Sequence, residues 1–150
     1  MLADQVKTRL EENVTVLAGR VQHALDLSEL IAREALPNGR DAAFVVPAGM
    51  RPQGNGESAA GAFTQSLDEV ITIVLVINSA GDVTGAKAAP RVDELLWDVI
   101  PLIAGWAPAD IDSAVYIGDF RFLRSQVLSL TKGAVICQVE FAIALQLRIF

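Results

Sequence analysis

The chain has 150 residues, of which 52% are hydrophobic and 20% are charged, and its formal net charge is −6. This length fits one domain around a single core, and the apolar composition predicts that part of the surface is buried against other subunits. The single cysteine excludes an intrachain disulfide, and the acidic balance argues against a protein that wraps nucleic acid. We therefore expect one domain, residues 1–150, that forms oligomers.

The N-terminal segment carries charges and no long apolar run. Val6 and Leu10 lie four residues apart among charged neighbours in residues 3–12, which predicts a short amphipathic helix. We expect no secretory signal here, and the longest stretch without a charge, residues 70–81, is shorter than the roughly 20 apolar residues that span a membrane. The prediction is a chain that stays in the cytoplasm and makes no membrane contact.

The next segment predicts several small elements. Residues 14–21 combine β-branched residues with a glycine, which indicates a short strand or a turn. A second helix is expected after a cap at Asp26 or Ser28, and the Pro-Asn-Gly of residues 37–39 ends it. Residues 43–47 then predict a strand that stops at its final proline.

Residues 48–66 (AGMRPQGNGESAAGAFTQS) are rich in small and polar residues and connect two predicted strands. Such a connection usually takes about two to six residues, so this one is unusually long. It could be a glycine-rich phosphate cradle or an extended loop that becomes ordered against a neighbour. A phosphate-binding loop needs a Lys and a Ser or Thr after its last glycine, whereas Ala62 and Phe63 follow Gly61 here. We therefore interpret residues 48–66 as an extended assembly loop.

A strand and a helix follow. Residues 69–78 (EVITIVLVIN) are apolar on both faces, as expected for a central strand that is covered on two sides. Residues 91–105 carry apolar side chains at helical spacing, and Pro101 is expected to kink the last turn. We expect Trp97 and Trp106 to anchor the core.

The chain closes with two long strands, residues 120–130 and 134–150, which are joined by a turn as a β-hairpin. Every odd position from 135 to 149 is apolar, so one face of the last strand should belong to the core, with Phe141 buried there. This strand would span about 50 Å, which predicts a bulge or a projection beyond the domain.

Candidate catalytic groups are few. His23 is the only histidine, and we interpret it as a solvated or packed side chain. Cys137 falls on the apolar face of the last strand, where burial would raise the pKa of its thiol. Asp110 and Asp112 are too few for a hard metal ion. We therefore predict no catalytic residues, no metal site and no cofactor.

The order of these features resembles the tail terminator family of long-tailed bacteriophages, in its Mu-like branch. The resemblance covers essentially the whole chain and is carried by FVVPAG (44–49), FTQSLDEVITIVLVI (63–77), GWAP (105–108) and VEFAIAL (139–145).

The resemblance implies an α+β fold with a mixed, mainly antiparallel β-sheet, two to three flanking helices, a long loop and a C-terminal β-hairpin. It further implies a structural virion protein, assembled in the host cytoplasm, that forms a homohexameric ring. The ring would cap the head-proximal end of the tail tube, stop tube polymerisation and join the head. Its partners would be the tail tube protein and head-tail connector or neck proteins, and genomic DNA would pass through its channel without specific binding.

A head-to-tail ring needs two different complementary patches on each subunit. The residues that we expect at the interface with other subunits or with the tube are Arg51, Gln53, Asn55, Glu57, Phe63, Gln138, Glu140, Gln146 and Arg148. Two other functions stay open at this point, a head-completion or neck ring and a small ligand-binding α/β domain.

Overall fold

The computed structural model describes residues 2–24, 41–79, 86–131 and 133–150. These residues form two α-helices, α1 (Leu2–Asn13) and α3 (Ala88–Ile103), and the short 3₁₀ helix η1 (Thr15–Leu17). The single sheet runs in the order β1-β2-β4-β6-β5, and β3 pairs with β4. The strands are β1 (Val21–His23), β2 (Ala42–Pro52), β3 (Glu57–Ala59), β4 (Ala62–Asn78), β5 (Tyr116–Thr131) and β6 (Ala134–Ile149). Only β1 and β2 pair in parallel, so the predicted α+β class with a mainly antiparallel sheet is confirmed.

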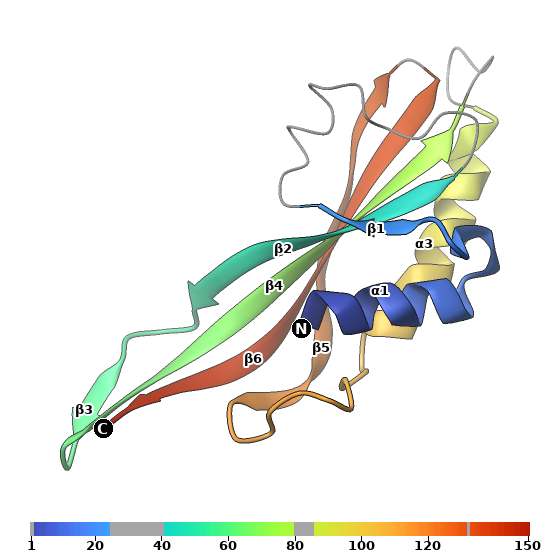
Figure 1. Cartoon of the computed structure of the whole chain (residues 1–150). Helices are drawn as coiled ribbons and strands as arrows, with labels where there is room; N and C mark the ends of the chain where they lie inside the picture. Colours follow the sequence, from blue (N-terminus) through green and yellow to red (C-terminus); the bar gives the residue numbers. More distant parts are fainter. Residues whose placement is uncertain (1, 25–40, 80–85, 132) are drawn as a thin grey trace.

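The sheet is built around β4 and β6, whose antiparallel register runs from Phe63 opposite Ile149 to Asn78 opposite Ala134 without a shift. Alternate side chains of both strands therefore point to one face, where α1 and α3 cover them (Figure 1). Phe141 is fully buried in this core, as predicted, and so is Cys137.

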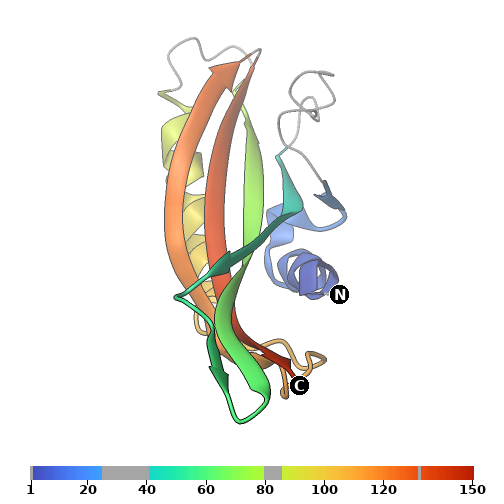
Figure 2. The same cartoon turned by 90° about the vertical axis from the view of Figure 1, so that its left-hand side faces the viewer.

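The opposite side of the sheet, which we call the back face, carries the other set of alternate side chains. Figure 2 views the sheet with α3 behind it. At one end of the back face a second apolar cluster is buried, made of Phe44, Val46, Val74, Val76, Ala134 and Ile136. The central strand β4 is therefore buried on both faces, as its sequence predicts.

The prediction that residues 48–66 form a loop is wrong. β2 continues to Pro52 after a register shift between Pro47 and Met50, and β3 and β4 then form a tight hairpin. Gly49 and Gly61 have positive φ, which allows the irregularity and the turn. Pro47 does not end its strand, because within the described residues β1 pairs with β2 only as far as Val45 and no strand pairs with that edge of β2 at Pro47.

These strands form an arm that projects from the body of the molecule and ends beside the C-terminus (Figure 1). We define the arm as residues 50–66 together with residues 146–149 of β6. β5 begins opposite Leu145, and the backbone N–H of Gln146 still donates to the Val115 carbonyl at 2.9 Å, so within the described residues β6 pairs only with β4 from Leu147 onward. The predicted projection of the last strand is thus confirmed, and the bulges of the terminal hairpin lie in β5.

The remaining elements follow the predictions in part. Residues 14–21 contain η1 and the first residue of β1, and the helix expected after residue 26 or 28 lies outside the described residues. Trp106 is half-buried and stacks on Phe120 with ring centroids 5.9 Å apart. Trp97, in contrast, is 65% exposed, because α3 turns Val92, Leu95, Val99 and Ile103 toward the core and Trp97 the other way.

Candidate functional site

The predicted interface residues gather on one side of the molecule. Cross-strand partners share a face of a sheet, and the register pairs Arg51 with Asp68, Gln138 with Val74, and Arg148 with Thr64. These residues therefore line the back face from its centre to the arm, as do Glu57, Glu140 and Gln146.

A buried carboxylate lies where the arm joins the body. Asp68 is 3% exposed and accepts hydrogen bonds from Arg121 of β5, from Gln53, and from Nε of Arg51 at 3.4 Å. The hydrogen bond from Arg121 is the largest influence and lowers the pKa of the Asp68 carboxyl from its ordinary 3.8, although burial acts in the opposite direction. The cluster connects β2, β4 and β5 at the base of the arm.

A second polar group lies further along the back face. Nε of Arg124 donates to Glu140 at 2.7 Å, and the Gln138 amide donates to the same carboxylate at 2.8 Å. The predicted residues Gln138 and Glu140 are thus in contact with each other, and Arg124 completes the group.

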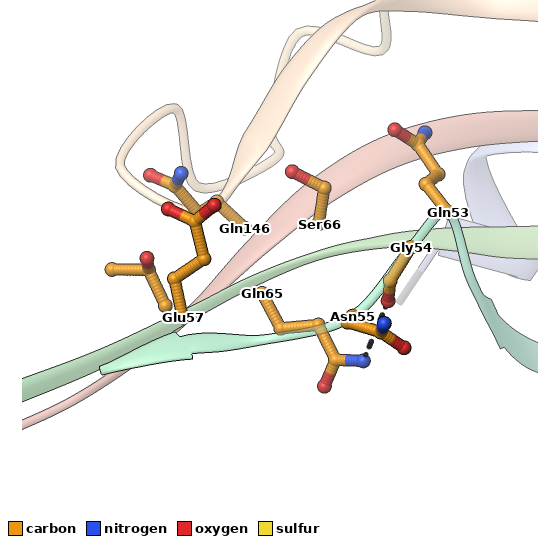
Figure 3. Close-up of a pocket in the computed structure, with 8 residues that line it drawn as sticks. Gln53, Gly54, Asn55, Glu57, Gln65, Ser66 and Gln146 are labelled. Carbon is orange, nitrogen blue, oxygen red and sulfur yellow. Dashed lines mark hydrogen bonds between the residues drawn. The ribbon is translucent and has the colours of Figure 1, made fainter.

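The back-face side of the arm holds a polar pocket of about 380 Å³. Glu57, Ser66 and Gln146 point to the same side in Figure 3, whereas the Gln65 amide turns away and donates to the Gly54 carbonyl at 3.1 Å. Gln53 and Asn55 also line the pocket. The side chains that line this pocket can form hydrogen bonds with another polar surface.

Phe63 is the exception among the predicted residues. It lies opposite Ile149 on the other face of the arm, and its ring packs directly on Gly56, where a Cβ would come within 2.0 Å of the ring. On that face Leu147 and Ile149 continue the apolar alternation of the core strand but are 37% and 54% exposed. The arm therefore has one polar and one partly apolar face.

Two side chains of these polar clusters escaped the sequence interpretation. Arg121 and Arg124 form ion pairs with Asp68 and Glu140 on the back face. The sequence held one signal for such partners, since Asp68 directly precedes the apolar run of residues 69–78, and a carboxylate buried there needs a partner.

The candidate groups His23, Cys137 and Asp112 belong to neither of these polar clusters, and the same holds for Tyr116. Nε2 of His23 is 2.8 Å from Asp4, and burial raises the pKa of the Cys137 thiol, as predicted. The Tyr116 hydroxyl donates to Glu69 at 2.6 Å, and burial together with this bond raises the pKa of Tyr116 to about 12. Asp112 accepts a hydrogen bond from the backbone of Ala114 in its own loop.

No group of three or more His, Cys, Asp or Glu side chains is arranged to hold a metal ion in the described residues. No helix in the described part of the chain is long and apolar enough to cross a membrane.

Comparisons with known proteins gave one family. The model of the family described as phage tail terminator protein matches residues 2–149. A solved structure titled "Virion of native gene transfer agent (GTA) particle" matches with a TM-score of 0.47 and 18% sequence identity, covering 97% of this chain and 94% of that chain. No curated protein matches this sequence.

Proposed function

Because the chain belongs to the phage tail terminator protein family, we propose that it forms a six-membered ring that caps the head-proximal end of the tail tube. The ring stops polymerisation of the tube and provides the surface to which the head is joined. Family membership itself makes the chain a structural tail protein that is located in the virion. We propose no catalytic role, cofactor or metal for it.

The β-arm is the observation that best supports this proposal. It carries hydrogen-bonding side chains on one face, including Gln53, Asn55 and Gln146, and exposed apolar side chains on the other. A projecting β-element of this kind costs conformational entropy and contributes little to the core, so a contact outside the subunit explains its presence. We propose that the arm touches the tail tube or the adjacent subunit.

The Asp68 cluster supports the same role. Arg121 and Gln53 hold the base of the arm from both sides through one buried carboxylate. An arm that is fixed before assembly loses less entropy when it binds, which favours association. In this proposal the neck or connector proteins bind the opposite surface of the ring, and genomic DNA passes through the channel without specific binding.

The capping function can be tested on growing tubes. Tail tube protein is polymerised alone or with this protein, and tube lengths are measured by electron microscopy. We expect tubes that stop at a limited length and carry a ring at one end. Tubes that grow to the same length with and without the protein would contradict the proposal. Binding to heads without any effect on tube length would favour a head-completion or neck ring instead.

A matched pair of variants tests whether the arm is needed for capping of the tail tube. Arg148→Glu alters the polar face of the arm, where Arg148 contacts the Gln146 amide, and should weaken capping. Lys7→Glu makes the same charge change on α1, outside the arm, and should cap like the wild type. If both variants cap tubes equally well, the polar face of the arm is not part of the proposed contact.

A further inference from the structure

The outer surface of α3 holds an exposed tryptophan among carboxylates. Trp97 is 65% exposed and lies on the side of the helix away from the core. Asp93 and Glu94 precede it by four and three residues, so they are its neighbours on the helix surface, and Asp98 follows it directly. Within the described residues, these three exposed carboxylates take part in no ion pair. We call these four residues the α3 patch.

An aromatic ring surrounded by carboxylates fits a guanidinium ion. The face of an indole attracts a cation, and arginine is the cation that most often stacks on it, while nearby carboxylates accept its hydrogen bonds. The α3 patch is therefore suited to a surface that presents arginines.

Such a surface exists on the same chain. The back face carries four arginines, which we call the arginine row and whose side chains are about half exposed or more: Arg51, Arg121, Arg124 and Arg148. The carboxylates on that side are Glu57, Asp68, Glu140 and Asp119, which like Arg121 flanks the core residue Phe120 and faces away from the core, so the charges of this face balance although the whole chain carries −6. Asp68 lies buried beneath its partners, which leaves the outermost layer richer in guanidinium groups.

The two surfaces lie on opposite sides of one sheet. α3 packs on one face of the sheet and turns Trp97 outward, whereas the arginine row belongs to the back face, which lies in front of α3 in Figure 2. One copy can therefore offer its α3 patch to the arginine row of the next copy, and the contact can repeat around a ring. This is the heterologous arrangement that a closed ring of more than two subunits requires.

We propose that the α3 patch of one subunit docks on the arginine row of a second copy of this chain. The inference deepens the proposed ring and rests on it, because it names the two surfaces that join neighbouring subunits. Trp97 stacks on a guanidinium at the centre of the contact, and the carboxylates of α3 accept hydrogen bonds from the guanidinium groups of the arginine row. The contact is partly electrostatic, so raising the salt concentration should weaken it.

The first test is self-association of the full-length chain, measured by sedimentation over a wide range of protein concentration. We expect the wild type to form multimers and Trp97→Ala to weaken association about 30-fold or more, because a central aromatic anchor is a typical hot spot. Glu12→Arg, a charge reversal on the exposed side of α1, should associate like the wild type. A wild type that stays monomeric at the highest concentration would overturn the inference.

The second test exchanges the charges. One variant carries Glu94→Arg and Asp98→Arg, and a second carries Arg124→Glu and Arg148→Glu. Each alone should associate at least about tenfold more weakly than the wild type, because like charges face each other at every contact. An equal mixture should associate again, since each altered surface meets its complement. Circular dichroism verifies that both variants fold, and a mixture of folded variants that stays dissociated would refute the contact.

The results of these tests distinguish a failure of the docking contact from a failure of the capping proposal. If Trp97→Ala and the exchanged charges leave association unchanged while the wild type still limits tube length, the docking surfaces are wrong and the capping proposal stands. If the variants lose association as expected but the wild type has no effect on tubes, the interface stands and the capping proposal fails.

Discussion

Replacing Asp68 by asparagine tests whether the buried carboxylate stabilises the junction between the arm and the body. Asparagine has nearly the same shape but no charge, and its amide group brings donors toward the donors of Arg121, Arg51 and Gln53. A hydrogen bond to a charged group contributes about 1.5–3 kcal/mol. The arginines are about half exposed and regain water in the variant, so we expect a loss of about 2 kcal/mol in the free energy of unfolding.

The measurement is urea unfolding at neutral pH, followed by circular dichroism. The matched control is Glu140→Gln, which removes a carboxylate of the same back face whose partner Arg124 has a side chain that is 61% exposed. We expect that variant to lose at most about 1 kcal/mol, as is usual for exposed ion pairs. A loss below about 0.5 kcal/mol for Asp68→Asn would show that the cluster does not stabilise the fold, contrary to our reasoning.

The pH dependence has a defined sign. Because the pKa of Asp68 is lower in the folded chain than its ordinary 3.8, the folded state holds this proton less tightly than the unfolded state does. The stabilisation is therefore complete above the ordinary value and is lost as the pH falls through the lower folded value. The difference in stability between wild type and Asp68→Asn should be constant near neutral pH and shrink below about pH 3.8.

Three further predictions concern the core, the arm and the channel. Phe141→Ala should lower the free energy of unfolding by about 3–5 kcal/mol, because it opens a cavity in a fully buried site, and urea unfolding would contradict this with a loss below about 1 kcal/mol. Replacing residues 54–61 by a short Gly-Ser turn keeps Arg51 and Gln53, so stability should change by about 1 kcal/mol at most while tube capping fails, and normal capping would exclude the arm tip from function. Six copies would carry a formal charge near −36, six times −6, so the purified ring should not retain duplex DNA, and salt-sensitive binding would contradict this.

Local periodicity determined the largest elements of this protein. A run that is apolar on both faces in residues 69–78 and alternation in residues 134–150 predicted the two central strands, and helical spacing in residues 91–105 predicted α3, because these patterns depend only on neighbours along the chain. The burial of Phe141 and Cys137 followed from the same alternation. The order of such features also carried the resemblance to the family that the family model then matched.

Tertiary structure decided what happens to residues 48–66. Their composition is that of a loop, and no local signal marks them as strands. They become extended because the end of β6, more than 80 residues away, provides the hydrogen-bonding edge for the first half of β4. Pairing partners that are distant in sequence can override weak β-propensity, so an arm of polar strands is hard to tell from a loop.

The same reason applies to the side chains that make up the candidate surfaces. Asp68 meets Gln53 across 15 positions and Arg121 across 53, and only the strand order β2-β4-β6-β5 brings these three onto one face. Trp97 lies outward because the packing of α3 on the sheet selects which side of the helix is buried, and that choice is made by the whole core. The sequence by itself determined which segments are apolar and how they alternate, whereas contacts between distant segments decided which polar groups meet.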